Sequence, residues 1–313
     1  AWDNPASGAF AGVDPTPGSK KPDPILVADS VRRAFGGIQA VSVDHLEVQR
    51  GAITALIGPN GAGKTTFFNL LTGFDKPDGG RVEFEGEMAT GQPSYTLAAK
   101  GMVRTFQLTK VLAKMSVLQN MMLAAQHQTG ESMWRGLLQG WRGQETEVRT
   151  RAIEVLERFN MVHMQGEFAG ALSGGQRKLL EMARSMMADP KLIMLDEPMA
   201  GVNPALTQSL LGHVKRLRAE GITVMFVEHD MDVVRDISDW VVVMAEGEVI
   251  AEGSADEIGS NQSVIDAYLG SSHSALTEEI ITGHVPDADE VRQLDEARQH
   301  QVDERRLDEE DRP

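Results

Sequence analysis

Hydrophobic residues along the chain follow two periods, which divide it into strand-like, helix-like and again strand-like stretches. From Ile25 the apolar residues come in short runs such as ITALIG and RVEFEG, separated by glycine-rich turns, and this pattern predicts β-strands. The pattern is helical over residues 111–170, and strand-like runs such as KLIML and TVMFVE return after Leu172. Because apolar strands alternate with helices, we expect an α/β fold with a mostly parallel sheet covered on both faces.

The two ends of the chain lack this patterning. Residues 1–24 combine several prolines with Gly, Ser and Asp and have no hydrophobic period, which predicts a flexible arm. Residues 271–313 are expected to form an acidic tail, because residues 287–313 carry many more acidic than basic side chains and almost no aliphatic ones. Such a segment buries too little surface to offset its ordering entropy, so it should be solvated or loosely helical. A regulatory tail is the alternative.

A glycine-rich stretch, GPNGAGKTT, has the pattern of a phosphate-binding loop. It follows the apolar run ITALI, precedes the helix-like TFFNLLTG, and fits the spacing G-x-x-x-x-G-K-[ST]. Inward-turned N–H groups of such a loop, with the positive end of the next helix, suit phosphate oxygens. Lys64 adds a charge for the β- and γ-phosphates, and the Thr65 hydroxyl suits Mg²⁺. The predicted phosphate-binding residues are Gly58, Pro59, Asn60, Gly61, Ala62, Gly63, Lys64, Thr65 and Thr66.

Two adjacent carboxylates, Asp196 and Glu197, follow the predicted strand LIML. Ligands of open parallel sheets lie beyond the carboxyl ends of the strands, so we expect Asp196 to serve Mg²⁺, through water. Glu197 is then placed to orient or polarise an attacking water near the γ-phosphate. Two solvated acids at a strand end are the plain structural alternative.

A second stretch, LSGGQ, also has the features of a phosphate-binding helix start. Ser173, Gly174 and Gly175 precede the helix-like RKLLEMARSMMADP and offer a hydroxyl, bare backbone and a helix dipole. One γ-phosphate cannot easily use both phosphate-binding ends of a chain if they lie in different lobes. We therefore expect a head-to-tail dimer that shares each site between chains, with a simple loop and helix cap as the alternative.

Composition and charge narrow the possible partners and the compartment. The 313 residues are 41% hydrophobic, contain no cysteine and carry a formal net charge of −16. This charge argues against a sequence-independent grip on nucleic acid and against anionic lipid, because such binding relies on Lys and Arg. No apolar window approaches the roughly 18 residues that span a bilayer, and no signal peptide is apparent. We expect a cytoplasmic protein that reaches membranes only through protein contacts.

These motifs together resemble the nucleotide-binding subunit of ATP-binding cassette (ABC) transporters. GPNGAGKTT, Gln107 in RTFQLTKVL, LSGGQ, LIMLDEP, AGVNP and His229 in VMFVEHD have the order and approximate spacing of that family over residues 25–270. The resemblance implies a P-loop NTPase (RecA-like) core with an antiparallel β subdomain. It also implies an α-helical subdomain inserted at about residues 108–185, and ATP and Mg²⁺ as cofactors.

The resemblance also assigns roles to single residues. Gln107 would lie in the loop joining the helical lobe to the core, touch Mg²⁺ or the attacking water, and sense a membrane subunit. His229 would contact the γ-phosphate, and Phe35 would stack on the adenine, although a core or turn Phe is the alternative. The signature residues, which would contact the ATP of the partner subunit, are Ser173, Gly174, Gly175 and Gln176.

Within this family, three stretches resemble the ATP-binding subunits of branched-chain or polar amino acid importers: GMVRTFQLTKVLAKMSVLQNMMLAAQ, LDEPMAGVNP and VIDAYLG. Asn203 stands where many cassettes have Asp, and its amide is expected to hold the turn by a side-chain to backbone hydrogen bond. The implied partners are a second ABC ATPase subunit in a homodimer or heterodimer, integral membrane permease subunits and a periplasmic or surface solute-binding protein, at the cytoplasmic face of the membrane. The alternatives are an ABC ATPase for lipid or lipopolysaccharide export and a non-transport ATPase switch.

Overall fold

Two β-sheets form the centre of the computed structural model, which describes residues 8–105, 111–125 and 141–270. One is antiparallel, with the strand order β2-β1-β4-β5. Its strands are β1 (Pro24–Phe35), β2 (Ile38–Gln49), β4 (Gly79–Phe84) and β5 (Glu87–Met88). The hairpin of β1 and β2 turns at Gly36 and Gly37, which both have positive φ, as the glycine pair in the sequence suggests.

The second sheet is the mostly parallel one that the sequence predicts. Its strand order is β10-β9-β3-β8-β7-β6, and all neighbouring pairs are parallel except β9 with β10. Its strands are β3 (Ile53–Ile57), β6 (Met102–Arg104), β7 (Leu192–Asp196), β8 (Thr223–Val227), β9 (Trp240–Ala245) and β10 (Glu248–Gly253). Every residue of β3, β7 and β8 is buried, which explains their continuous apolar runs.

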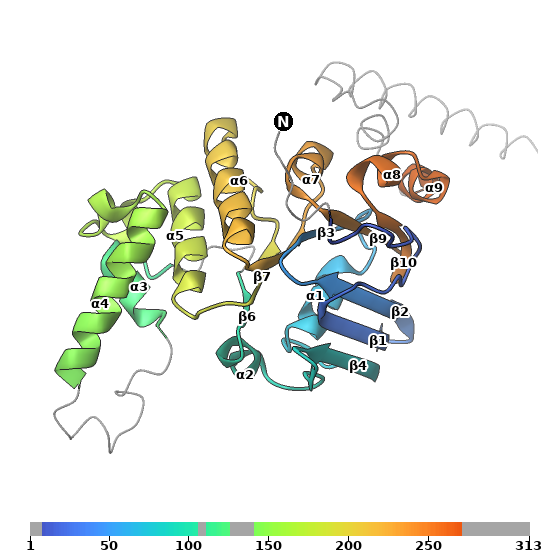
Figure 1. The fold of residues 1–313 in the computed structure, drawn as a ribbon, viewed down its shortest axis with the longest axis horizontal. Helices are drawn as coiled ribbons and strands as arrows, with labels where there is room; N and C mark the ends of the chain where they lie inside the picture. The colour runs from blue at the N-terminus through green and yellow to red at the C-terminus, as the bar shows by residue number, and fades with distance from the viewer. Residues whose placement is uncertain (1–7, 106–110, 126–140, 271–313) are drawn as a thin grey trace, which may run out of the picture.

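Helices cover this sheet on both faces. They are α1 (Lys64–Leu71), α2 (Ser94–Ala99), α3 (Val117–Leu123), α4 (Trp141–Arg158), α5 (Gly174–Met186), α6 (Pro204–Ala219), α7 (Met231–Ile237), α8 (Ala255–Gly259) and α9 (Gln262–Gly270). Two short 3-10 turns precede α5, at Val162–Met164 and Ala169–Ala171. Helices α3, α4 and α5 stand together beside the sheet (Figure 1), in the part of the chain where an inserted helical subdomain is expected.

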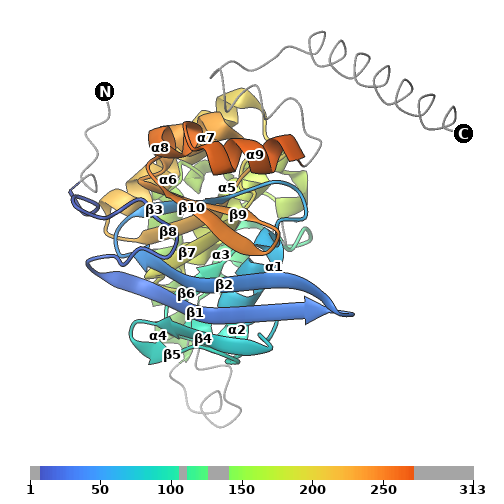
Figure 2. The same ribbon diagram turned by 90° about the vertical axis from the view of Figure 1, so that its right-hand side faces the viewer.

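Alternate side chains of the parallel strands enter two separate hydrophobic cores. Ile193 and Leu195 of β7 pack with residues of α3 to α7, whereas Leu192 and Met194 of the same strand pack with α1 and the antiparallel sheet. Figure 2 shows the antiparallel sheet on one side of the six-stranded sheet and α7, α8 and α9 on the other. Strand β3, which leads into the loop before α1, also contributes side chains to both cores.

The segment before β1 differs from the expected flexible arm. Over residues 8–23 it has no helix or strand, as its prolines suggest, but it is anchored to the core. The Phe10 ring stacks on Trp240 with their centroids 4.7 Å apart, and the Lys21 ammonium lies 2.8 Å from the Glu252 carboxylate, with both side chains fully buried. The proline-rich composition indicated the irregular backbone correctly but gave no sign of these contacts. Residues 1–7 and the predicted acidic tail, 271–313, lie outside the described residues.

Candidate functional site

The predicted phosphate loop joins β3 to α1, in the strand, loop and helix order that the pattern requires. Gly58 has φ 146°, and a Cβ built there would lie 2.0 Å from the carbonyl oxygen of Met244. Gly63 has φ 92°, and its Cβ would lie 2.4 Å from the carbonyl oxygen of Ala40. Only glycine fits both positions, because a side chain would collide with backbone that cannot move aside.

The first turn of α1 is open to a ligand on its N-terminal side. The residue that precedes the helix, Gly63, offers no side chain to cap it, so the first N–H groups of α1 keep their capacity to bind an anion. Thr65 is exposed on this turn and Thr66 is half-buried. The loop thus combines backbone donors, a helix dipole and a hydroxyl, as phosphate binding requires.

The Lys64 ammonium folds back over this loop. It donates hydrogen bonds to the carbonyl oxygens of Gly58 at 2.6 Å and Pro59 at 2.8 Å. Burial lowers the pKa of Lys64, and the nearby Glu197 carboxylate partly opposes this shift. A half-buried cation beside these backbone donors would add positive charge for a phosphate chain.

Asp196 ends β7 and is paired with an arginine that the sequence interpretation missed. The Arg104 guanidinium lies 2.6 Å from the Asp196 carboxylate, with the two side chains 7% and 5% exposed. Arg104 also donates to Asn69 of α1 at 2.6 Å. It therefore connects β6, β7 and the helix that follows the phosphate loop, whereas its place in RTFQ gave no hint of these partners.

Asp196 and Thr65 offer oxygen atoms that suit Mg²⁺ at this edge of the sheet. The Arg104 guanidinium bonds one oxygen of Asp196, Oδ2, and the Thr65 hydroxyl stands exposed on the first turn of α1. One carboxylate and one hydroxyl, completed by phosphate oxygens and water, are what Mg²⁺ commonly takes in nucleotide sites. The residues present thus fit the ion, which would neutralise phosphate charge there.

Glu197 begins a sharp turn directly after β7. Its φ is 45°, a left-handed conformation that is uncommon for a residue with a side chain. Its N–H donates to the carbonyl oxygen of Val227 at 3.0 Å, which fixes the turn to the end of β8. Glu197 is half-buried, and its negative charge favours the charged form of Lys64.

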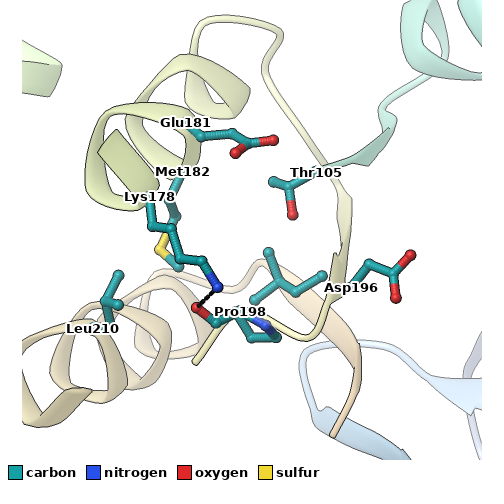
Figure 3. Close-up of a pocket in the computed structure, with 8 residues that line it drawn as sticks. Thr105, Lys178, Glu181, Met182, Asp196, Pro198 and Leu210 are labelled. Atoms are coloured by element: carbon teal, nitrogen blue, oxygen red, sulfur yellow. Dashed lines mark hydrogen bonds between the residues drawn. The ribbon is translucent and has the colours of Figure 1, made fainter. Parts of the chain in front are cut away.

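Two more charged residues missed by the sequence interpretation surround this turn. The Lys178 ammonium of α5 donates to three carbonyl oxygens within residues 197–200, and a carboxylate oxygen of Glu228 accepts from the N–H of Met199 at 2.9 Å. Burial raises the pKa of Glu228. Figure 3 shows Lys178 reaching Pro198, while the Asp196 carboxylate points away from it. A small pocket separates α5 from the end of β7 here.

His229 follows β8 at the same edge of the sheet. Its side chain is 56% exposed and therefore accessible to a ligand, and it is the residue after the buried Glu228. The parallel strands β3, β7 and β8 thus deliver the phosphate loop, the Asp196–Glu197 pair and His229 to one edge, as the sequence predicts. Strand β8 lies between β3 and β7.

The LSGGQ stretch starts α5, as predicted. The Ser173 hydroxyl accepts from the N–H of Gln176, and the Gln176 side chain accepts from the N–H of Ser173 at 2.8 Å, so the two form a capping box. Gly174 is exposed, whereas Gly175 is buried. Figure 1 places α5 with the helical group and α1 with the sheets. The structure therefore does not bring the two predicted phosphate-binding ends together within this chain.

Three further predicted positions have different outcomes. Phe35 ends β1, is 48% exposed, and has the Arg33 guanidinium 4.6 Å from its ring centroid. The ring therefore makes a cation-π contact with Arg33, and its stacking on adenine stays a prediction. The Asn203 side chain accepts from the N–H of Leu206 at 3.0 Å and caps α6, as expected. Gln107 lies outside the described residues, and its contacts stay a prediction.

The fold and the arrangement of charged groups define a class of protein. A glycine loop between a strand and a helix, with carboxylates at the end of a parallel strand in the same sheet, makes this chain a P-loop NTPase. Its antiparallel sheet and its group of three helices are the additional parts that the sequence predicted.

Comparison with known proteins gives the family. Residues 41–200 match the family model described as ABC transporter, and residues 248–274 match the model described as branched-chain amino acid ATP-binding cassette transporter. The chain therefore belongs to the ABC transporter family and is an ATPase of that family.

Relatives and solved structures agree with this placement. A probable branched-chain amino acid transport ATP-binding protein, LivG of Archaeoglobus fulgidus, is 41% identical over 80% of this chain and 98% of its own length. The high-affinity branched-chain amino acid transport ATP-binding protein BraF of Pseudomonas aeruginosa is 41% identical over 79% of this chain and 98% of its own length. A solved ATP-binding cassette of an ABC transporter in its ADP conformation is 37% identical, covers 79% of this chain and 99% of its own, and has a TM-score of 0.69.

Among the described residues, no helix has the length and apolar character needed to cross a membrane.

Proposed function

We propose that this chain powers the import of branched-chain or related amino acids through a separate membrane permease. The observation that carries the proposal is its similarity to ATP-binding proteins of branched-chain amino acid transport, which extends over nearly their whole length. The match of residues 248–274 to a model of the same transporter type supports it at the C-terminal end of the cassette.

In the proposed hydrolysis site, the loop of residues 58–66 binds the phosphates of ATP, and Thr65 and Asp196 hold Mg²⁺. Glu197 orients or polarises the attacking water, and His229 contacts the γ-phosphate. This assignment is supported by the common edge at which β3, β7 and β8 end and by the position of Lys64 inside the loop. Phe35 stacks on the adenine and Gln107 joins the metal or the water.

The proposed site is completed by a second chain. Ser173, Gly174, Gly175 and Gln176 of one cassette contact the ATP held by the other, in a homodimer or a heterodimer with a second cassette. The separation of α5 from α1 within this chain supports the proposal, because one γ-phosphate cannot then reach both ends. Binding of ATP closes the two cassettes and hydrolysis reopens them, which shifts the permease between states.

The proposed partners are integral membrane permease subunits, and through them a solute-binding protein on the opposite face of the membrane. The cassette would then work at the cytoplasmic face. Purification of an affinity-tagged chain from membranes of its source organism tests this. Membrane-spanning permease subunits should co-purify in a fixed ratio, whereas a tagged chain recovered without any integral membrane protein would contradict a transport role.

The role of Glu197 is tested by Glu197→Gln, which keeps the size of the side chain and removes its negative charge. ATP should bind with unchanged affinity, while turnover falls by about 10²-fold or more, as for loss of a preorganised catalytic group. The exposed Glu87, paired with Lys100 away from this edge, provides a matched control as Glu87→Gln. Turnover of Glu197→Gln equal to that of this control would remove Glu197 from the mechanism.

A further inference from the structure

The turn that carries Glu197 has a conformation that its own sequence does not favour. Glu197 has a φ of 45°, and a residue with a side chain persists there only where its surroundings enforce it. The N–H of Glu197 is fixed to Val227 of β8, but this bond does not hold the residues that follow. Within the turn, the N–H of Ala200 donates to the carbonyl oxygen of Glu197 at 3.2 Å. Contacts from outside the turn hold residues 198–200 as well.

Lys178 supplies the most direct of these contacts. Its ammonium donates to the carbonyl oxygens of Glu197 at 3.0 Å, Pro198 at 3.0 Å and Ala200 at 2.6 Å. An ammonium has three donors, and here three carbonyl oxygens converge on it. These three bonds are made together only while the turn keeps this shape. Figure 3 shows the side chain extending from α5 to the turn.

Glu228 binds a backbone N–H group of the same turn. Its carboxylate is buried and accepts from the N–H of Met199 at 2.9 Å. The turn is therefore held by a cation on its carbonyl side and by an anion on its amide side. Because Glu228 directly precedes His229, this contact also joins the turn to the end of β8.

The start of α5 packs closely against the same region. A Cβ built at Gly175 would lie 1.8 Å from Leu206 of α6 and 3.4 Å from Val202, just beyond the turn. Lys178 is three residues further along the helix. A displacement of α5 must therefore carry with it the cation that the turn needs.

We propose that Lys178 is a positioning residue for ATP hydrolysis, which holds the turn of Glu197 and links it to the helix that begins with LSGGQ. The inference rests on the proposed role of Glu197. It makes hydrolysis by a cassette depend on the position of its own α5, the helix whose N-terminus is proposed to serve the ATP of the partner. The two ATP sites of a dimer are thereby connected through one side chain in each subunit.

The test uses Lys178→Met in the full-length chain, which keeps the length of the side chain and removes its donors. Lys191→Met is the matched control, because Lys191 is a lysine 52% exposed that pairs with Glu85 away from the turn. Single-turnover hydrolysis of radiolabelled ATP, ATP affinity and thermal unfolding are measured for both. Lys178→Met should hydrolyse ATP about 10- to 100-fold more slowly, as for a misplaced catalytic group, with ATP affinity kept within about twofold. Lys191→Met should behave as wild type.

A double-mutant cycle separates positioning from a general structural effect. If Lys178 acts through Glu197, then Lys178→Met should cause no additional slowing in the Glu197→Gln chain. Equal slowing in both backgrounds, or full turnover of folded Lys178→Met, would overturn the inference and leave the role of Glu197 intact. Full turnover of Glu197→Gln alone would instead overturn that role, and the inference with it. If Lys178→Met does not fold, the cycle is run with Lys178→Arg, whose slowing must likewise vanish in the Glu197→Gln chain.

Discussion

Replacement of Arg104 by methionine should destabilise the nucleotide-free protein far more than loss of an ordinary surface ion pair. The Arg104 guanidinium lies 2.6 Å from the Asp196 carboxylate and 2.6 Å from the Asn69 side-chain oxygen. Its carbon atom ζ is 5.3 Å from the ring centroids of Phe68 and Phe74. Methionine fills much of the same space between the rings but donates no hydrogen bond.

The magnitude follows from the burial of the pair. With side-chain exposures of 7% for Arg104 and 5% for Asp196, the substitution leaves a largely buried carboxylate without its cation. Removal of one partner of a buried pair costs about 3–5 kcal/mol. The Arg151–Asp189 pair is the contrast, because its side chains are 37% and 80% exposed and such pairs contribute about 0–1 kcal/mol.

Urea unfolding of the full-length chain without nucleotide, followed by circular dichroism, measures both changes. Arg104→Met should lower the free energy of unfolding by about 3–5 kcal/mol, and Arg151→Met by at most about 1 kcal/mol. Equal small losses in the two variants would show that the Asp196 carboxylate does not need Arg104 for the stability of the fold.

Three other predictions concern the loop, the N-terminal segment and a buried histidine. Gly58→Ala should bind a fluorescent ATP analogue at least about tenfold more weakly, because its Cβ would meet backbone at 2.0 Å and displace the loop; unchanged binding would contradict this. Lys21→Met should lower the free energy of unfolding, measured in urea, by about 3–5 kcal/mol, because it leaves the Glu252 carboxylate buried without its cation. A loss below about 1 kcal/mol would show that this pair contributes no more than a surface ion pair. Burial lowers the pKa of His213 to about 4. The free energy of unfolding that the neutral histidine contributes is therefore present above its unfolded pKa of about 6.5 and is lost as the pH falls towards 4. In His213→Phe the loss of stability between pH 7 and pH 5 should be about 2 kcal/mol smaller than in wild type, and an equal loss would exclude this histidine as its source.

The parts of the fold that could be predicted from the sequence are those whose signal is local. The runs that became β3, β7 and β8 are continuously apolar because both of their faces are buried. The phosphate loop has a fixed spacing of glycines, and the Asn203 cap involves a partner only three residues away. Each of these features can be recognised within a few residues of sequence.

The parts that could not be predicted depend on contacts between distant residues. Lys21 and Glu252 are 231 positions apart, so a proline-rich segment that is anchored has the same local composition as a free one. Arg104 and Asp196 are 92 positions apart, and Lys178 meets the turn of Glu197 only after α5 packs against β7. A single charged side chain in a helix or strand does not indicate which backbone or carboxylate it will meet.

ATP hydrolysis by this chain should drive amino acid import, and the uptake of radiolabelled leucine measures this coupling directly. The full-length chain is co-purified with its permease subunits, placed in lipid vesicles with the solute-binding protein, and supplied with ATP. Vesicles with the wild-type chain should accumulate leucine when ATP is supplied, whereas those with Glu197→Gln should show only background uptake at normal ATP binding. Equal leucine uptake by the two assemblies, or none with wild type while it hydrolyses ATP, would contradict this coupling.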